Sequence, residues 1–150
     1  SNAPNQPPRG ERVMSEETSQ ELRRLMRLVV AKGTGRKAAA PGYLVGGKTG
    51  TAEKSKRRGY SRRSLISSFV GAFPMTDPRY VVLVVLDEPQ GTKKTHGFAT
   101  GGWVAAPVVS RIVERAAPLL GIGPTDEQAP AVLRRLDIEL KPEGRRLASY

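Results

Sequence analysis

A five-residue link between two strand-like runs constrains the fold of this chain more than any other feature. Residues 64–73 alternate along the chain and place Leu65, Phe69 and Phe73 on one strand face, while residues 80–86 are continuously apolar. The link at 74–78 reads Pro-Met-Thr-Asp-Pro, which is turn-forming and too short for a crossover helix. The two runs are therefore predicted to pair as an antiparallel hairpin, with 80–86 buried on both faces.

Further periodic segments flank this hairpin. Residues 16–32 carry an apolar stripe at helical spacing, between an N-cap at Ser15 and a glycine at position 33. Residues 43–51 begin with β-forming side chains, and residues 103–120 carry a second helical stripe, with Pro107 in its first turn. The order α-β-β-β-α without crossover helices predicts an α+β fold, in which helices cover an antiparallel sheet of three strands.

The chain has 150 residues, enough for one domain. Ser1-Asn2-Ala3 matches the remnant of a cleaved affinity tag, so we expect a piece of a longer protein. We predict a linker over 4–14, the folded part over 15–122 and a loosely ordered tail over 123–150.

Composition excludes several classes of protein. The longest apolar run, at 81–86, is too short for a membrane span. Without cysteine there is no disulfide or thiol nucleophile, and with His96 as the single histidine we expect no metal site and no cofactor. The net charge of +11 includes six cations in the link at 54–63, which we interpret as a solvated hairpin tip, with an anion site as the open alternative.

Residues 42–49 satisfy the P-loop pattern G-x-x-x-x-G-K-[ST], and Asp87 follows an apolar strand as a magnesium-binding aspartate does. A P-loop needs a strand before its first glycine and a helix beginning at its lysine. Here Lys-Ala-Ala-Ala-Pro precedes Gly42, and strand-forming residues lie inside the supposed loop. A nucleotide-binding P-loop is therefore the third-ranked interpretation.

The preferred interpretation places Lys48-Thr49-Gly50-Thr51 on a strand beside a cleft. Alternation puts the two threonines on one face and Lys48 and Gly50 on the other. A cation, two hydroxyls and a glycine suit an extended peptide that ends in a carboxylate. A polar edge strand without a ligand remains open from these four residues alone.

The surroundings of this motif resemble the C-terminal half of the transpeptidase domain of class B penicillin-binding proteins, of the cell-division (FtsI-like) type. Lys-Thr-Gly is one of three sequence signatures of penicillin-binding proteins and β-lactamases. The resemblance covers roughly 12–122, in stretches at 12–15, 25–30, 32–38, 43–53, 68–74, 81–89 and 106–109. It implies part of the β-lactamase/transpeptidase-like fold, with a helix on each face of the sheet and the 43–51 strand at its edge.

The resemblance also implies a function. Family members are serine-type D,D-transpeptidases that cross-link D-Ala-D-Ala stem peptides in septal peptidoglycan and are trapped by β-lactams. Lys48 would attract the substrate carboxylate and aid proton movement, and Thr49 and Thr51 would hydrogen-bond that carboxylate. Gly50 would let the ligand approach, and the Thr51 N–H would be an oxyanion-hole donor, a role worth about 3–4 kcal/mol in acyl transfer.

This chain departs from the family pattern in one decisive respect. No serine has a lysine three positions later, and no S-x-N triplet is present. We therefore expect the chain to be inactive alone. The parent is expected on the outer side of the bacterial inner membrane, anchored by a segment that this chain lacks, with division-complex membrane proteins as possible partners.

The alternative from another class is a basic module that binds nucleic acid or an acidic partner, with the Lys-Thr-Gly match accidental. Scarce aromatic residues argue against a specific RNA platform, so no nucleic acid is expected. Because the rest of a domain is missing, we also expect self-association through apolar surface beside residues 81–86.

Overall fold

The computed structural model describes residues 10–56 and 59–138, except for the side chains of 55–63. The predicted tag remnant, part of the linker and the end of the tail lie outside this range. Helix α1 spans Glu16–Lys32, as predicted, and the Ser15 side chain accepts a hydrogen bond from the backbone N–H of Thr18. Gly33 ends the helix in an extended conformation, where a Cβ would lie 2.9 Å from the backbone of Val29.

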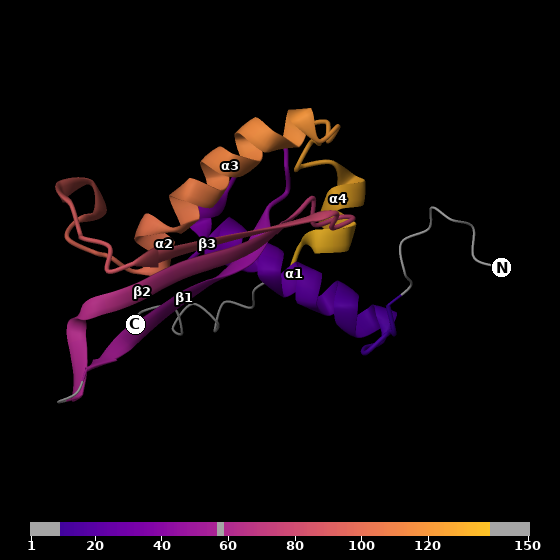
Figure 1. Ribbon diagram of the computed structural model, residues 1–150. Helices are drawn as coiled ribbons and strands as arrows, with labels where there is room; N and C mark the ends of the chain where they lie inside the picture. Colours follow the sequence, from indigo (N-terminus) through magenta and orange to yellow (C-terminus); the bar gives the residue numbers. More distant parts are fainter. Residues whose placement is uncertain (1–9, 57–58, 139–150) are drawn as a thin grey trace, which may run out of the picture.

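Three antiparallel strands follow in the order β1-β2-β3, which confirms the predicted sheet (Figure 1). They are β1 (Gly46–Lys56), β2 (Gly59–Phe73) and β3 (Tyr80–Asp87). Strand β1 begins later than the predicted residue 43, because Leu44 takes a left-handed backbone (φ 47°) while its side chain is buried. In the basic link at 54–63 the strands remain paired as far as Lys56 and Gly59, with a register shift between Glu53 and Lys54. The predicted hairpin tip itself, at 57–58, lies outside the described residues.

One face of the sheet packs against the helices that follow it. The predicted helix at 103–120 is divided into α2 (Gly101–Val104) and α3 (Ala106–Leu119). Pro107 has no N–H to donate to the carbonyl of Trp103, which accounts for the division. Phe69, Phe73 and Val84 of the sheet form a core with the buried residues of α3, which are Ala106, Val109, Val113 and Ala117.

Helix α1 covers the opposite face, alongside β1, so the sheet carries a helix on each face (Figure 1). Ala72 of β2 joins a second cluster on this side with Met26 of α1, Leu44 and Met75. Helix α4 (Pro130–Leu136) completes the cluster by burying Val132 and Leu136. Helix α4 lies within the tail that we predicted over 123–150, and residues 139–150 of that tail lie outside the described range.

Strand β3 differs from its prediction. Val84 is buried under α3, but Val81, Leu83 and Val85 on the other face are 72%, 64% and 54% exposed. The prediction that 80–86 is buried on both faces is therefore wrong. Helix α1 lies along β1 and does not extend over β3, so that face has no cover in the described part of the chain. Among the described residues no helix is long and apolar enough to cross a membrane.

Candidate active site

The Lys-Thr-Gly-Thr motif lies in the first half of β1, which is an edge strand of the three-stranded sheet. Lys48 pairs with Val70, and Thr51 pairs with Ser67. A P-loop requires a helix to begin at Lys48, but the chain there is extended and paired as a strand. The nucleotide-binding interpretation is therefore wrong.

The two threonines share one face of β1, as alternation predicts, and this face lies toward α2. The hydroxyl of Thr51 accepts a hydrogen bond from the backbone N–H of Gly101 at 3.1 Å. The hydroxyl of Thr49 lies 3.2 Å from that of Thr34, in the turn after α1. Gly101 packs so closely on the sheet that a Cβ there would lie 2.2 Å from the carbonyl oxygen of Ser68. The start of α2 and the turn after α1 thus flank the threonine face of β1.

Lys48 and Gly50 lie on the other face. Lys48 is exposed, and its ammonium donates to the carbonyl oxygen of Thr49 at 2.8 Å. The structure gives Lys48 no carboxylate partner among the described residues, so its charge is available to an anionic ligand. A Cβ on Gly50 would lie 2.5 Å from the hydroxyl oxygen of Ser68, so a larger residue here would require that hydroxyl to change its rotamer.

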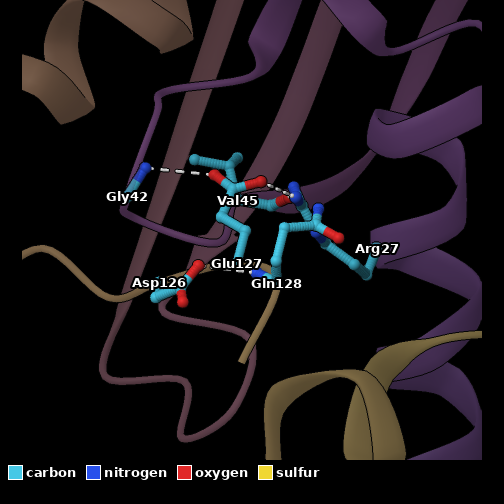
Figure 2. Close-up of polar contacts among 6 residues, drawn as sticks. All are labelled: Arg27, Gly42, Val45, Asp126, Glu127 and Gln128. Atoms are coloured by element: carbon cyan, nitrogen blue, oxygen red, sulfur yellow. Dashed lines mark hydrogen bonds and ion pairs between the residues drawn. The ribbon is translucent and has the colours of Figure 1, made fainter. Parts of the chain in front are cut away.

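Sequence reasoning missed the contacts that fix the start of β1. Glu127 accepts from the backbone N–H of Gly42 at 3.0 Å and from the Arg27 guanidinium at 2.7 Å (Figure 2). Arg27 also donates to the carbonyl oxygen of Val45 at 2.9 Å. We call these four residues the tail clamp. It joins α1, the segment before β1 and the segment before α4. Because its members lie up to 100 residues apart, no pattern of neighbouring residues in the sequence predicts these contacts.

The tail clamp borders a cleft of about 330 Å³ between α1 and α4. Leu44, Val132 and Leu136 line the cleft together with Arg27 and Glu127. None of the four motif residues lines it, so its role is separate from that of the motif strand.

An aromatic group follows the sheet, close to the threonine face of β1. Trp103 of α2 stacks on Phe98 with ring centroids 5.5 Å apart and meets the edge of the exposed His96. The ammonium of Lys37 lies 4.4 Å from the centre of the Trp103 ring. These contacts tie α2 to the preceding loop, and they give His96 an aromatic neighbour.

Asp87, the supposed magnesium ligand of a P-loop protein, has a cation of the chain itself as its partner. The ammonium of Lys54 lies 2.6 Å from Asp87 and 3.3 Å from Glu88. The hydrogen bond to Asp87 raises the pKa of Lys54 above its ordinary value. No cluster of acids and histidines suited to a metal ion occurs in the described ranges, 10–56 and 59–138.

Comparison with known proteins covers most of the chain. Residues 3–114 match the family described as the penicillin binding protein transpeptidase domain. A curated relative, the probable peptidoglycan D,D-transpeptidase FtsI of Caulobacter vibrioides, is 49% identical over 124 residues, which are 77% of this chain and 21% of that protein.

Solved structures give the same result. The TP domain of penicillin-binding protein 3 from Burkholderia pseudomallei matches with a TM-score of 0.70 and 44% identity, over 84% of this chain and 37% of that one. Penicillin-binding protein 3 from Mycobacterium tuberculosis, complexed with ampicillin, matches with a TM-score of 0.70 and 27% identity, over 91% of this chain and 31% of that one. The chain therefore spans well under half the length of each of these proteins.

Proposed function

Because this chain belongs to the penicillin-binding protein transpeptidase family and its relatives are of the cell-division type, we propose that it forms one wall of a D,D-transpeptidase active site. The observation that carries the proposal is the extended Lys48–Thr51 run on an edge strand, within the stretch that matches the family. Its parent would cross-link stem peptides of septal peptidoglycan.

In this proposal each motif residue acts on the end of an acyl-D-Ala-D-Ala peptide. Lys48 attracts the terminal carboxylate, and the hydroxyls of Thr49 and Thr51 hydrogen-bond to it. The Thr51 N–H stabilises the oxyanion that forms when a serine attacks the penultimate carbonyl and D-Ala leaves. An amine of a second stem peptide then takes the acyl group from the serine.

The open edge of β1 supports these roles. An extended peptide can pair with a free strand edge through its backbone, which places its carboxylate along the strand. The hydrogen bonds of Thr49 and Thr51 to the turn after α1 and to α2 already orient both hydroxyls. A ligand therefore meets side chains whose rotamers are restricted before it binds.

The serine nucleophile must come from elsewhere in the parent, because this chain has no Ser-x-x-Lys. We propose that the chain alone is inactive, needs no cofactor, and derives from a parent that acts outside the inner membrane, with stem peptides and β-lactams as ligands. The rival interpretation, a basic binding module, assumes that the Lys-Thr-Gly match is accidental. A family match that spans the motif argues against that assumption.

Two labelling experiments with a fluorescent penicillin test the proposal. The isolated chain should show no covalent label on a denaturing gel, and labelling at any of its serines would contradict the predicted inactivity. In the parent, Lys48→Ala should slow acylation by about a hundredfold or more. Lys32→Ala, which removes an exposed lysine at the end of α1, is the matched control. Equal acylation rates in the two variants would refute the role of Lys48.

A further inference from the structure

Ser67 is a polar side chain at a fully buried position of β2. It shares a face of the sheet with Phe69 and Phe73, which belong to the apolar core, yet it is a serine with no exposed surface. A buried hydroxyl is costly unless it is hydrogen-bonded, and this one donates to the carbonyl oxygen of Ala99, in the segment that leads into α2. The proposed transpeptidation assigns no step to this hydroxyl, so its contribution must come through the Ala99 contact.

The segment that Ser67 holds leads directly to the hydroxyl of Thr51. Gly101, two residues after Ala99, donates its backbone N–H to Oγ1 of Thr51 at 3.1 Å. Thr51 and Ser67 are direct partners in the pairing of β1 with β2, so their side chains are neighbours on one face of the sheet. Residues 99–101 therefore bridge the two side chains of this pair, with a hydrogen bond at each end.

The start of α2 fits so closely on the sheet that its position is restricted. A Cβ on Gly101 would lie 2.2 Å from the carbonyl oxygen of Ser68 and 2.6 Å from that of Gly50. A Cβ on Gly102 would lie 2.5 Å from the carbonyl oxygen of Thr34. Both glycines thus pack on backbone atoms, which cannot turn aside as a side chain can. All of these contacts join elements of this chain, so they do not depend on the remaining part of the parent's domain.

We propose that Ser67 is a positioning residue for the Thr51 hydroxyl and acts through residues 99–101; this inference rests on the proposed function of the motif. A threonine hydroxyl has one proton and two lone pairs, and the N–H of Gly101 occupies one lone pair of Thr51. A carboxylate only accepts hydrogen bonds, so Thr51 must turn its proton toward the ligand. Gly101 favours that orientation because it donates from the protein side. Without Ser67, residues 99–101 would be held less firmly and the hydroxyl would be less well oriented before the ligand binds.

Hydrogen exchange in this chain tests the positioning without any ligand. Ser67→Ala removes the donor to Ala99, so the amide proton of Gly101 should exchange about five to ten times faster than in the wild type. Ser110→Ala is the matched control, because it removes a hydroxyl of α3 that donates to the carbonyl oxygen of Ala39 at 2.7 Å. It should leave exchange at Gly101 unchanged. Unaltered exchange at Gly101 in Ser67→Ala would overturn the proposal.

A double-mutant cycle in the parent tests the effect on the reaction, with the rate of acylation by a fluorescent penicillin as the readout. Thr51→Val removes the hydroxyl and should slow acylation at least about tenfold. Ser67→Ala should slow it about fivefold when Thr51 is present, but less than about twofold in the Thr51→Val background, because Ser67 acts through that hydroxyl. Ser67→Cys keeps the size of the side chain with a weak S–H donor and should give an intermediate rate. Thermal unfolding verifies that each variant is folded at the assay temperature.

The cycle also separates this proposal from the proposed function. Equal slowing by Ser67→Ala in both backgrounds would show a general structural effect and would contradict positioning through Thr51. A slow Thr51→Val beside an unaffected Ser67→Ala would remove the role of Ser67 and leave the proposed function intact. A Thr51→Val variant that acylates at the wild-type rate would remove both the carboxylate contact of Thr51 and this proposal, whereas the role of Lys48 is tested by its own variant.

Discussion

Replacing Glu127 by alanine removes the centre of the tail clamp, and the structure gives the size of the effect. The Glu127 carboxylate accepts from Arg27 at 2.7 Å and from the Gly42 N–H at 3.0 Å. The Arg27 side chain is 13% exposed and that of Glu127 is 32% exposed, so the guanidinium would lose its counter-ion in a partly buried place. The segment that leads into β1 would lose its fixed position at the same time.

A hydrogen bond to a charged group contributes about 1.5–3 kcal/mol, and partial exposure lowers that value. We therefore expect Glu127→Ala to reduce the free energy of unfolding by about 2–3 kcal/mol. For a chain of this size the melting temperature would fall by about 5–10 °C. Glu127→Gln keeps one carbonyl acceptor but turns an NH₂ group toward a donor, so we expect a loss of about 1–2 kcal/mol.

Urea denaturation at a fixed low protein concentration measures these losses, with Asp137→Asn as the control. Asp137 is half-exposed and lies 4.0 Å from Lys32, so its replacement should change stability by less than about 0.5 kcal/mol. Hydrogen exchange gives a local readout, because the Gly42 amide donates to Glu127 and should exchange at least about tenfold faster in Glu127→Ala. Unchanged stability together with unchanged exchange at Gly42 would refute the clamp.

Two further predictions concern the ends of β1 and the start of α2. The Asp87 carboxylate raises the pKa of Lys54 in the folded state, so the stability from this contact is present below the unfolded-state pKa of about 10.4. That stability is lost as the pH rises through the higher pKa that Lys54 has in the folded state. Urea denaturation over this pH range should therefore show a smaller fall in the free energy of unfolding for Lys54→Met than for the wild type. Gly101→Ala places a Cβ 2.2 Å from the Ser68 carbonyl oxygen and should cost about 1–3 kcal/mol in thermal or urea unfolding. Gly123→Ala, with no atom within 4 Å of its Cβ, should leave stability nearly unchanged, and equal losses in the two glycine variants would count against close packing of α2.

Local patterns predicted the elements that carry the motif. The apolar stripe with Ser15 as its N-cap defines α1 at both ends, and the short link at 74–78 allows only a hairpin. Alternation also predicted that Lys48 and Thr49 lie on opposite faces of the strand. These features depend on neighbours within a few residues, so they can be derived before the chain folds.

Other features escaped local reasoning. The backbone pairing beyond Glu53 needs no apolar side chains, so the sequence carries no alternating signal for it. Leu44 takes a left-handed backbone because burial against Met75 and α4 compensates for the local strain.

By itself the sequence determined an antiparallel α+β arrangement with the motif on a strand, because periodicity and link length are properties of neighbouring residues. Only the tertiary structure decided that Glu127 holds the start of that strand and that one face of β3 has no cover. A contact across 100 residues exists only after the chain closes that loop. The exposure of Leu83 likewise depends on where α1 lies, and no pattern within β3 contains that information.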